Sequence, residues 1–253
     1  MKEEIISLKN ISKTFVQSSF DGTVNFKALD EISLTVFKGE SILISGANGS
    51  GKTLLMSIIA GLIRPSSGLV DVKERCGIVF QDSDLQILGE TPEEDIMFGL
   101  KNIKLPQEER KKRLETALEK TGLKDKRYYS SRSLSGGEKR RLCVAGILAM
   151  KFPVIIFDEP YANLDYEGVV QVNSLIKELK AENYTLLILS HELEKCYALA
   201  DRFLVLHRGK KVFDGTAEEG LGQNLKEWSI RPPLTSSAVS SFVSNESVPL
   251  SIS

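Results

Sequence analysis

The residues with the clearest chemical meaning lie between positions 46 and 53, where the spacing is G-x-x-x-x-G-K-T. Gly46, Gly49 and Gly51 lack a Cβ, so backbone N–H groups can turn inward and approach phosphate oxygens. Lys52 is placed to reach the outer phosphates, and the Thr53 hydroxyl is placed to hold Mg²⁺. The spacing predicts a nucleoside triphosphate site with its magnesium ion, formed by Gly46, Ala47, Asn48, Gly49, Ser50, Gly51, Lys52 and Thr53.

A second group of candidates is the acid pair Asp158 and Glu159, which follows the apolar run of residues 154–157. Ligand sites in open α/β sheets lie at the carboxyl ends of the strands. Burying charge without a partner is costly, so a metal ion or a polarised water is expected beside these carboxylates. We expect Asp158 to hold Mg²⁺ and Glu159 to orient or deprotonate an attacking water.

Gln81 and His191 also follow short apolar strands, at residues 76–80 and 185–189. The amide oxygen of Gln81 could bind a metal ion or orient a water, although a solvated glutamine at a strand end is the commoner case. His191 is expected at the same sheet edge as the acids. The alternative for His191 is a surface histidine at the start of a helix.

Residues 134–138 read Leu-Ser-Gly-Gly-Glu and open a helix that is expected to run to about residue 150. Ser135 can cap the helix, and Gly136 and Gly137 leave its first N–H groups bare, which suits a phosphate. One nucleotide does not need two such helix ends in the same subunit. This end is therefore expected to serve a nucleotide held by another subunit, and a simple capped helix is an equally good interpretation of this segment alone.

The elements around these motifs predict an α/β fold of the P-loop NTPase type. Residues 42–44 form a buried strand and residues 54–59 a helix packed on it, while residues 5–11 and 32–37 suit an N-terminal antiparallel sheet. Residues 17–25 are polar and are expected to form a hairpin or a loop. Phe15, just after the first strand, is equally well explained as a core side chain and as a stacking face for a purine base.

Residues 82–133 become charged and helical, with helix starts near residues 90–95 and 106–109. They predict a helical insert. A hairpin is expected over residues 203–213, around Arg208-Gly209, with His207 in its turn. After Gly222 the periodic pattern of apolar residues becomes weak.

Composition narrows the functional classes. The 253 residues include 33 basic and 34 acidic side chains, a balance that gives no support for nucleic acid as a main partner. The three cysteines are widely separated and favour a reducing compartment over disulfides or zinc. The N-terminus carries no signal peptide, and the longest apolar stretch, near residues 54–63, is too short to cross a bilayer. We therefore expect a soluble chain that reaches a membrane only through partner subunits.

Taken together, these motifs resemble the nucleotide-binding subunit of ABC transporters, over nearly the whole chain to about residue 230. The resemblance identifies Phe15 with the A-loop aromatic, residues 46–53 with Walker A, Gln81 with the Q-loop, residues 134–138 with the signature, Asp158 and Glu159 with Walker B, Asn163-Leu164-Asp165 with the D-loop, and His191 with the switch histidine. It implies a head-to-tail pair of subunits that encloses two ATP molecules, each held by the Walker A of one subunit and the signature of the other.

A finer resemblance is to the ATPases of energy-coupling factor importers, which take up vitamins and cobalt or nickel ions. It is carried by residues 77–86, 90–99, 140–141 and 145–150, and by Arg231-Pro232-Pro233. Tyr161 stands where Thr is usual, and Asn163 where Gly is usual before Leu-Asp, which leaves open whether the pair is a homodimer or a heterodimer.

This resemblance implies an ABC ATPase domain over residues 1–230, with a helical subdomain inserted at about residues 82–150, and a tail over residues 231–253 that is either packed or flexible. It implies ATP and Mg²⁺ as ligands, a second ATPase subunit, a transmembrane coupling subunit and a substrate-binding membrane subunit, with the chain peripheral at the cytoplasmic face of the membrane. Rival interpretations are a soluble ABC ATPase that acts on nucleic acid or ribosomes, and a P-loop kinase or binding module.

The insert is expected to carry the contact with the transmembrane subunit. We expect a groove beside residues 85–98 that receives short helices, with apolar contacts offered by Leu85, Ile87, Leu88, Ile96, Met97 and Phe98. About half of these side chains are expected to be the insert's own core instead.

Overall fold

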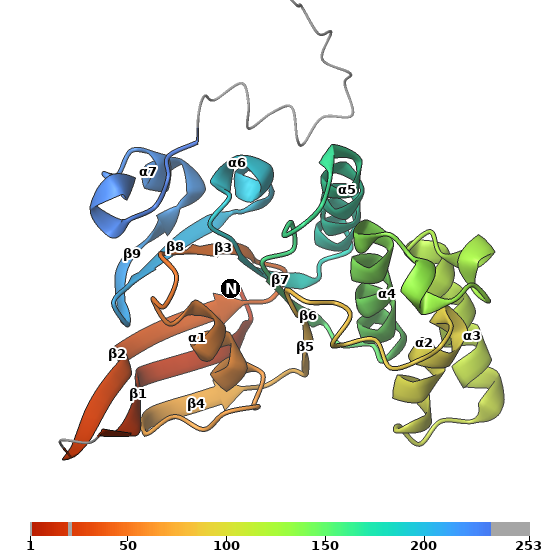
Figure 1. Ribbon diagram of the computed structural model, residues 1–253, viewed down its shortest axis with the longest axis horizontal. Helices are drawn as coiled ribbons and strands as arrows, with labels where there is room; N and C mark the ends of the chain where they lie inside the picture. The colour runs from red at the N-terminus through yellow and green to blue at the C-terminus, as the bar shows by residue number, and fades with distance from the viewer. Residues whose placement is uncertain (1, 20–21, 234–253) are drawn as a thin grey trace, which may run out of the picture.

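The computed structural model describes residues 2–19 and 22–233 of the chain, and its central element is a six-stranded sheet with the order β5-β6-β7-β3-β8-β9. The strands β3 (Ser41–Ser45), β5 (Cys76–Val79), β6 (Val154–Asp158), β7 (Thr185–Leu189) and β8 (Arg202–His207) are parallel, and β9 (Lys210–Thr216) pairs antiparallel with β8. The carboxyl ends of the parallel strands therefore meet at one edge (Figure 1).

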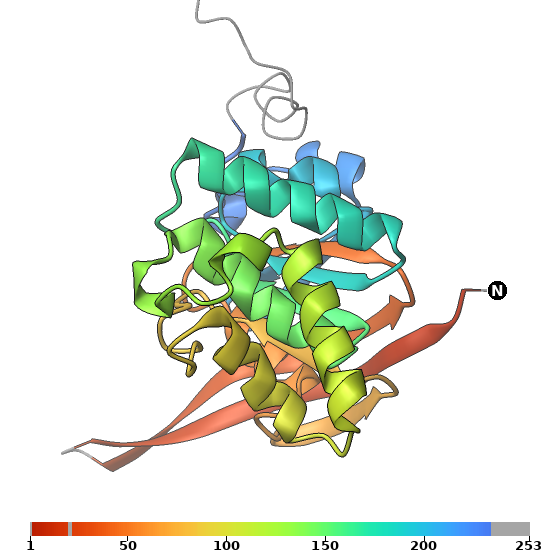
Figure 2. The ribbon, with the colours of Figure 1, turned by 90° about the vertical axis from the view of Figure 1, so that its right-hand side faces the viewer.

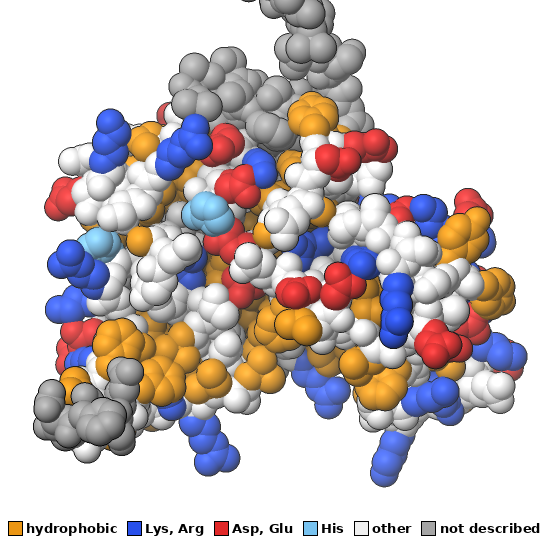
Figure 3. Space-filling model, viewed as in Figure 1, with side chains coloured by type: hydrophobic (Ala, Val, Ile, Leu, Met, Phe, Trp, Pro, Cys, Tyr) orange, Lys and Arg blue, Asp and Glu red, His pale blue; other side chains and the backbone are white. Residues whose placement is uncertain are grey.

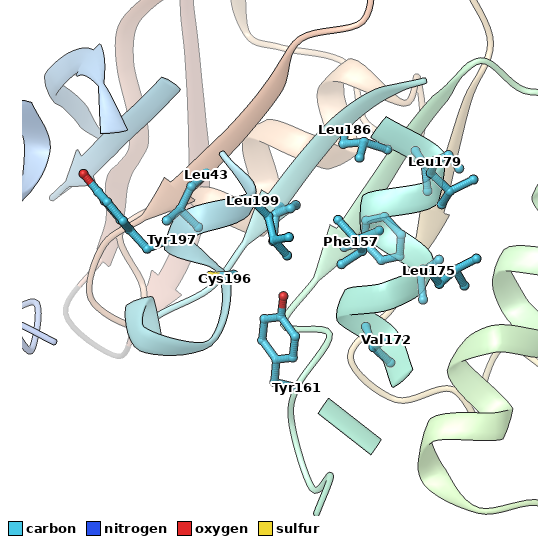
Figure 4. Close-up of a cluster of buried hydrophobic side chains, with 14 of the residues drawn as sticks. Leu43, Phe157, Tyr161, Val172, Leu175, Leu179, Leu186, Cys196, Tyr197 and Leu199 are labelled. Atoms are coloured by element: carbon cyan, nitrogen blue, oxygen red, sulfur yellow. The ribbon is translucent and has the colours of Figure 1, made fainter. Parts of the chain in front are cut away.

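Alternate residues of these strands enter two separate cores. On β3, Ile42 and Ile44 pack with helix α1 (Lys52–Ile59) and the antiparallel sheet, whereas Leu43 packs on the opposite face. Figure 4 shows this second core, where Phe157 and Leu186 lie near side chains of helix α5 (Tyr166–Ala181), and Leu43 lies beside Leu199. Both sheet faces are covered, which is why the parallel strands are continuous apolar runs.

The antiparallel sheet has the order β2-β1-β4, formed by β1 (Glu4–Ser19), β2 (Gly22–Phe37) and β4 (Ser67–Val72). Of the two alternatives for the polar residues 17–25, the hairpin is correct. The strands β1 and β2 are longer than the sequence predicted and pair as one long hairpin that projects from the body (Figure 2). Phe15, expected just after the first strand, lies within β1 and pairs with Phe26. Cross-strand backbone hydrogen bonds hold such a ribbon together without a buried apolar face.

The predicted helical insert consists of α2 (Pro92–Lys101), α3 (Gln107–Lys120) and α4 (Gly136–Ala149), with short 3-10 turns at Lys124–Lys126 and Ser131–Ser133. Ile96, Leu114 and Leu142 belong to its own core. Thr91 caps α2, and the carboxylates of Glu93, Glu94 and Asp95 lie in its first turn, at the positive end of the helix dipole. Helix α4 lies between the other two helices and the central sheet, so it connects the insert to the site edge (Figure 1).

The chain after β7 forms α6 (Leu193–Cys196), a 3-10 turn at Tyr197–Leu199, α7 (Ala217–Leu221) and a 3-10 turn at Leu225–Trp228. The hairpin turns at Arg208-Gly209, where the sequence placed it, but His207 is the last residue of β8 and does not belong to the turn. The pattern does not decay structurally after Gly222, because Leu225 and Ile230 are buried in the core. Of the tail expected over residues 231–253, residues 234–253 lie outside the described part of the chain. Within the described part of the chain, no helix is long and apolar enough to cross a membrane.

Tyr161, at the position where Thr was expected, is the largest side chain of the core beside the acid pair. It is fully buried, and its hydroxyl donates to Asn173 Oδ1 at 2.8 Å. Asn173 in turn donates to the carbonyl of Lys195 at 2.7 Å. The ring and its hydrogen bond thus join the segment after β6 to α5 and to α6.

We predict that Tyr161→Phe lowers the free energy of unfolding by about 1–3 kcal/mol, because the buried hydrogen bond from the Tyr161 hydroxyl to Asn173 is lost. Urea unfolding checks this value. Tyr129→Phe is the matched control, since that ring is 57% exposed, and it should leave the stability unchanged within about 0.5 kcal/mol. Equal stability of both variants and the wild type would contradict a structural role for the Tyr161 hydroxyl.

Candidate functional site

The glycine loop follows β3 directly and enters α1 at Lys52. Gly46 and Gly51 have φ angles of 151° and 101°, in the region that favours glycine. A Cβ at Gly46 would lie 2.1 Å from the carbonyl oxygen of Leu206, and one at Gly51 would lie 2.5 Å from the Leu29 side chain. The loop can keep this shape only with glycine at both positions, as the spacing predicted.

Lys52 is buried within this loop. Its ammonium group donates to the carbonyl oxygens of Gly46 at 2.7 Å and Ala47 at 3.2 Å. Burial lowers the pKa of Lys52, while Glu159 and Asp158 act in the opposite direction. The loop therefore holds a cation that faces two carboxylates and is ready to exchange carbonyl partners for phosphate oxygens.

The predicted magnesium donors come together at the end of β6. The Thr53 hydroxyl donates to Asp158 Oδ2 at 3.0 Å, and Gln81 lines the same hollow. Burial raises the pKa of the Asp158 carboxyl, and its hydrogen bond to Thr53 partly offsets this effect. No group of three or more His, Cys, Asp or Glu side chains that could hold a metal ion occurs among the described residues. A hydroxyl, a carboxylate and an amide oxygen suit Mg²⁺, which proteins usually bind through few carboxylates together with substrate phosphates.

Glu159 and His191 form the pair expected beside an attacking water. His191 Nδ1 lies 2.9 Å from Glu159 Oε1, and the His191 backbone N–H donates to the other oxygen at 3.4 Å. Glu159 is 9% exposed, whereas the His191 side chain is 59% exposed. A buried carboxylate held by an exposed histidine can accept a proton from a water on the open side.

Most of the residues predicted at the glycine loop, the acid pair, Gln81 and His191 surround one hollow of about 300 Å³, lined by Ala28, Asn48, Gly49, Ser50, Gly51, Lys52, Thr53, Leu54, Gln81, Asp158 and Glu159. Gly46, Ala47 and His191 lie outside this lining. The lining residues come from β2, the glycine loop, α1 and the ends of β5 and β6. The hollow can hold a polyphosphate beside a metal ion, with the Glu159 carboxylate at its edge.

The predicted helix end at residues 134–138 forms a separate hollow of about 340 Å³, lined by Ser135, Gly136, Gly137, Glu138, Asn163, Leu164, Asp165, Glu167, Gly168 and Gln171. Ser135 caps α4 with a capping box, as expected. The Glu138 side chain completes that box and pairs with Lys126, so its carboxylate is already occupied. Asp165 caps α5 by accepting from the Gly168 N–H at 2.8 Å. Neither hollow shares a lining residue with the other.

Phe15 lies in neither lining. It is 44% exposed beside Phe26, which is 56% exposed, and the ammonium group of Lys13 lies 5.4 Å from its ring centre. The core explanation for Phe15 is therefore wrong. Apolar side chains gather over this hairpin on the face that Figure 3 shows.

Sequence reasoning missed one residue that lines the site and one that is buried behind it. Ala28 lines the first hollow, and no sequence signal marks an alanine in a hairpin strand. Arg140 is buried next to the acid pair, and a basic side chain among the apolar positions of α4 was the available signal.

The insert presents two adjoining hollows of about 740 Å³ and 560 Å³, which share Leu88, Gly89 and Glu90 in their linings. Of the side chains expected to face a membrane subunit, Leu85, Leu88 and Phe98 are 81%, 67% and 52% exposed. Ile96 is fully buried in the insert's core, and Ile87 and Met97 pack against that core.

Comparison with known proteins places the chain in a family. Residues 29–162 match the model of the ABC transporter family. The energy-coupling factor transporter ATP-binding protein EcfA2 of Clostridium tetani is 37% identical over 228 residues, which cover 83% of this chain and 78% of that protein. The cobalt import ATP-binding protein CbiO of Rhodobacter capsulatus is 38% identical over 233 residues, covering 85% of this chain and 82% of that protein.

Solved structures agree with this match. CbiO1 of Clostridium perfringens, described as part of the ABC transporter complex CbiONQ, has a TM-score of 0.77 at 30% identity and covers 91% of this chain and 96% of its own. A dimeric ATP-binding cassette in a post-hydrolysis state, bound to ADP and Pi, has a TM-score of 0.72 at 25% identity, with coverage of 84% and 99%. With its glycine loop, acid pair and helix end arranged as described, the chain belongs to the ABC transporter family of ATPases.

Proposed function

We propose that this chain is the ATP-hydrolysing subunit of an importer of the energy-coupling factor type, which powers uptake of a vitamin or a transition-metal ion through membrane partners. The names of the relatives support the importer type, since they include EcfA2 and the cobalt import protein CbiO. The observation that carries the catalytic part is the convergence of Lys52, Thr53, Gln81, Asp158 and Glu159 on one hollow.

In the proposed reaction, water attacks the terminal phosphate of ATP and ADP leaves. Lys52 would bind the outer phosphates, and Glu159, oriented by His191, would accept a proton from the water. Thr53, Asp158 and Gln81 would hold Mg²⁺, which neutralises charge on the phosphates. Gly46–Thr53 would supply the N–H groups around them, and the exposed ring of Phe15 would stack on the adenine base.

The separation of the two hollows supports a two-subunit arrangement. Ser135, Gly136 and Gly137 present a helix N-terminus that shares no lining residue with the chain's own phosphate hollow. A second ATPase subunit, related head to tail, would place its nucleotide against this end, with Glu138 and Asp165 as the neighbouring residues. In this head-to-tail dimer, the nucleotide sandwich, each nucleotide would lie between the glycine loop of one subunit and the helix end of the other.

The proposed membrane partners are a transmembrane coupling subunit and a separate substrate-binding membrane subunit, with this chain peripheral at the cytoplasmic face. The hollows of the insert support a docking site for the coupling subunit, because the exposed side chains of Leu88 and Phe98 line them. The exposed Leu85 lines neither hollow, but it directly follows Asp84, which lines the larger one. The net charge of −1 favours this role over a nucleic-acid partner.

We predict that Glu159→Gln retains ATP binding but lowers the rate of phosphate release by about 10²–10⁴-fold, because the water loses its base while the phosphate cradle is intact. Phosphate release and ATP titration on the same samples measure both properties. Glu192→Gln is the control, since it removes the carboxylate next to His191 that pairs with Lys195. Wild-type turnover by Glu159→Gln would assign the base to another residue.

We predict that Gly136→Asp blocks ATP-driven dimerisation and spares ATP binding to the monomer, because the new carboxylate repels the γ-phosphate held by the partner. A Cβ at Gly136 would lie 3.0 Å from the Leu164 side chain, so Gly136→Ala separates crowding from charge. Size-exclusion chromatography with ATP measures dimerisation, carried out in the Glu159→Gln background to prevent hydrolysis. Normal dimers of the Asp variant would rule out the sandwich.

We predict that Leu85→Lys and Leu88→Lys prevent recovery of the assembled transporter without changing the basal ATPase activity. Both side chains are exposed in the free subunit, so lysine costs it little, whereas a docked apolar helix would meet a charge. Co-purification of membrane subunits checks this. Leu69→Lys, at a leucine of β4 that is 71% exposed, is the matched control. Normal assembly of both variants would move the docking site elsewhere, and absence of any membrane partner for the wild type would favour a soluble role.

A further inference from the structure

Arg140 is a buried arginine at the start of the helix that carries the second hollow. It lies on α4 at 4% exposure, five positions after the capping Ser135. Neither hollow includes it in its lining. Its guanidinium group nevertheless contacts segments that come from both.

One side of the guanidinium holds the segment that follows β5. Arg140 Nη1 donates to the carbonyl oxygens of Phe80 at 2.7 Å and Gln81 at 2.5 Å, and to Ser83 Oγ at 3.1 Å. Gln81 lines the phosphate hollow, and the chain beyond Ser83 leads into α2 of the insert. The position of the Gln81 backbone is therefore tied to α4.

The other side holds the segment that follows the acid pair. Arg140 Nε donates to the carbonyl oxygen of Pro160 at 3.1 Å, and Nη2 donates to that of Ala162 at 3.2 Å. Pro160 comes directly after Glu159, and Ala162 comes directly before Asn163, which lines the second hollow. The same side chain thus fixes the backbone on both sides of Tyr161.

Only arginine can make this set of bonds. Its planar fork offers five N–H donors in fixed directions and keeps its charge, whereas lysine offers three donors from a single atom. Among the described residues, the hydrogen bonds of Arg140 go to backbone carbonyls and one hydroxyl, and none goes to a carboxylate. A buried cation satisfied by carbonyls of two different loops makes the relative position of those loops depend on one side chain.

We propose that Arg140 is a positioning residue that couples the chain's own nucleotide site to the helix end that completes the partner's site. A nucleotide that contacts Gln81 or Glu159 shifts the loops at residues 80–83 and 160–162, which Arg140 holds. Because Arg140 belongs to α4, the first turns of α4 move with these loops. This inference rests on the proposed function, because it assigns one hollow to each of two nucleotides. Through this coupling, nucleotide binding at one site would change the nucleotide affinity of the other site.

Backbone hydrogen exchange of the full chain, with and without Mg·ADP, tests the coupling in the single subunit. In the wild type, nucleotide should protect residues 46–54 and also change exchange in residues 80–84, 134–139 and 161–165. In Arg140→Gln, protection of residues 46–54 should remain, while the changes in 134–139 are lost. Arg140→Lys should give the same loss, and it retains the charge if the glutamine variant does not fold.

Arg141→Gln is the matched control. This neighbouring arginine is half-buried and donates to the Thr121 carbonyl at 2.9 Å and to Gln171, so it contacts neither loop. It should behave like the wild type. Exchange changes confined to residues 46–54 in the wild type would overturn the proposal without any variant. Wild-type exchange changes at residues 134–139 in Arg140→Lys would also overturn it. So would loss of these changes in Arg141→Gln. Absence of protection at residues 46–54 in the wild type would instead overturn the proposed nucleotide site itself.

A kinetic measurement gives a readout that a purely structural arginine would not move. The ATP dependence of hydrolysis should be sigmoidal for the wild type and hyperbolic for Arg140→Lys, with the nucleotide affinity of the isolated subunit changed by less than about twofold. A parallel loss of affinity and of cooperativity would assign Arg140 to general stability of the fold and would contradict the coupling role.

Discussion

Lys52 is buried within the same hollow as Asp158 and Glu159, and the rest of the structure depends on this arrangement of charge. Burial by itself lowers the pKa of Lys52 and raises the pKa of Asp158, so each group would tend to lose its charge. Their mutual attraction opposes this tendency. Hydrogen bonds stabilise both charges, because Lys52 donates to a carbonyl of the glycine loop and Asp158 accepts from Thr53. This requirement fixes where the loop, α1 and the end of β6 must lie.

The parallel sheet meets this requirement by bringing the ends of separate strands to one edge. The turn after β6 is sharp, and Glu159 has a φ of 48°, a conformation that non-glycine residues adopt rarely. The Glu159 N–H donates to the carbonyl oxygen of Leu189 at 2.9 Å, which offsets part of that strain and places the carboxylate beside His191. Strain of this kind is characteristic of functional sites.

The two departures from the family pattern are explained by the same turn. Asn163 has a φ of 60°, a left-handed conformation that glycine adopts freely and that asparagine tolerates better than most residues. Tyr161 fills the core between α5 and α6 and joins them through Asn173. The segment between the acids and α5 is therefore held by side chains of its own, together with Arg140, without glycine at residue 163.

The sequence by itself determined the glycine loop, the acid pair after β6, the capped helix end at Ser135 and the family, because each depends on local backbone rules and on residue spacing. It also predicted the insert and most strands, since their periodicity is strong. Tertiary structure decided the rest. The length of the β1–β2 hairpin depends on pairing between strands, and the exposure of Phe15 and Leu88 depends on what packs nearby. Arg140 contacts two residues that precede it by 60 and 59 positions, and two others that follow it by 20 and 22 positions. Such contacts form only when the chain has folded, so no spacing along the sequence could reveal them.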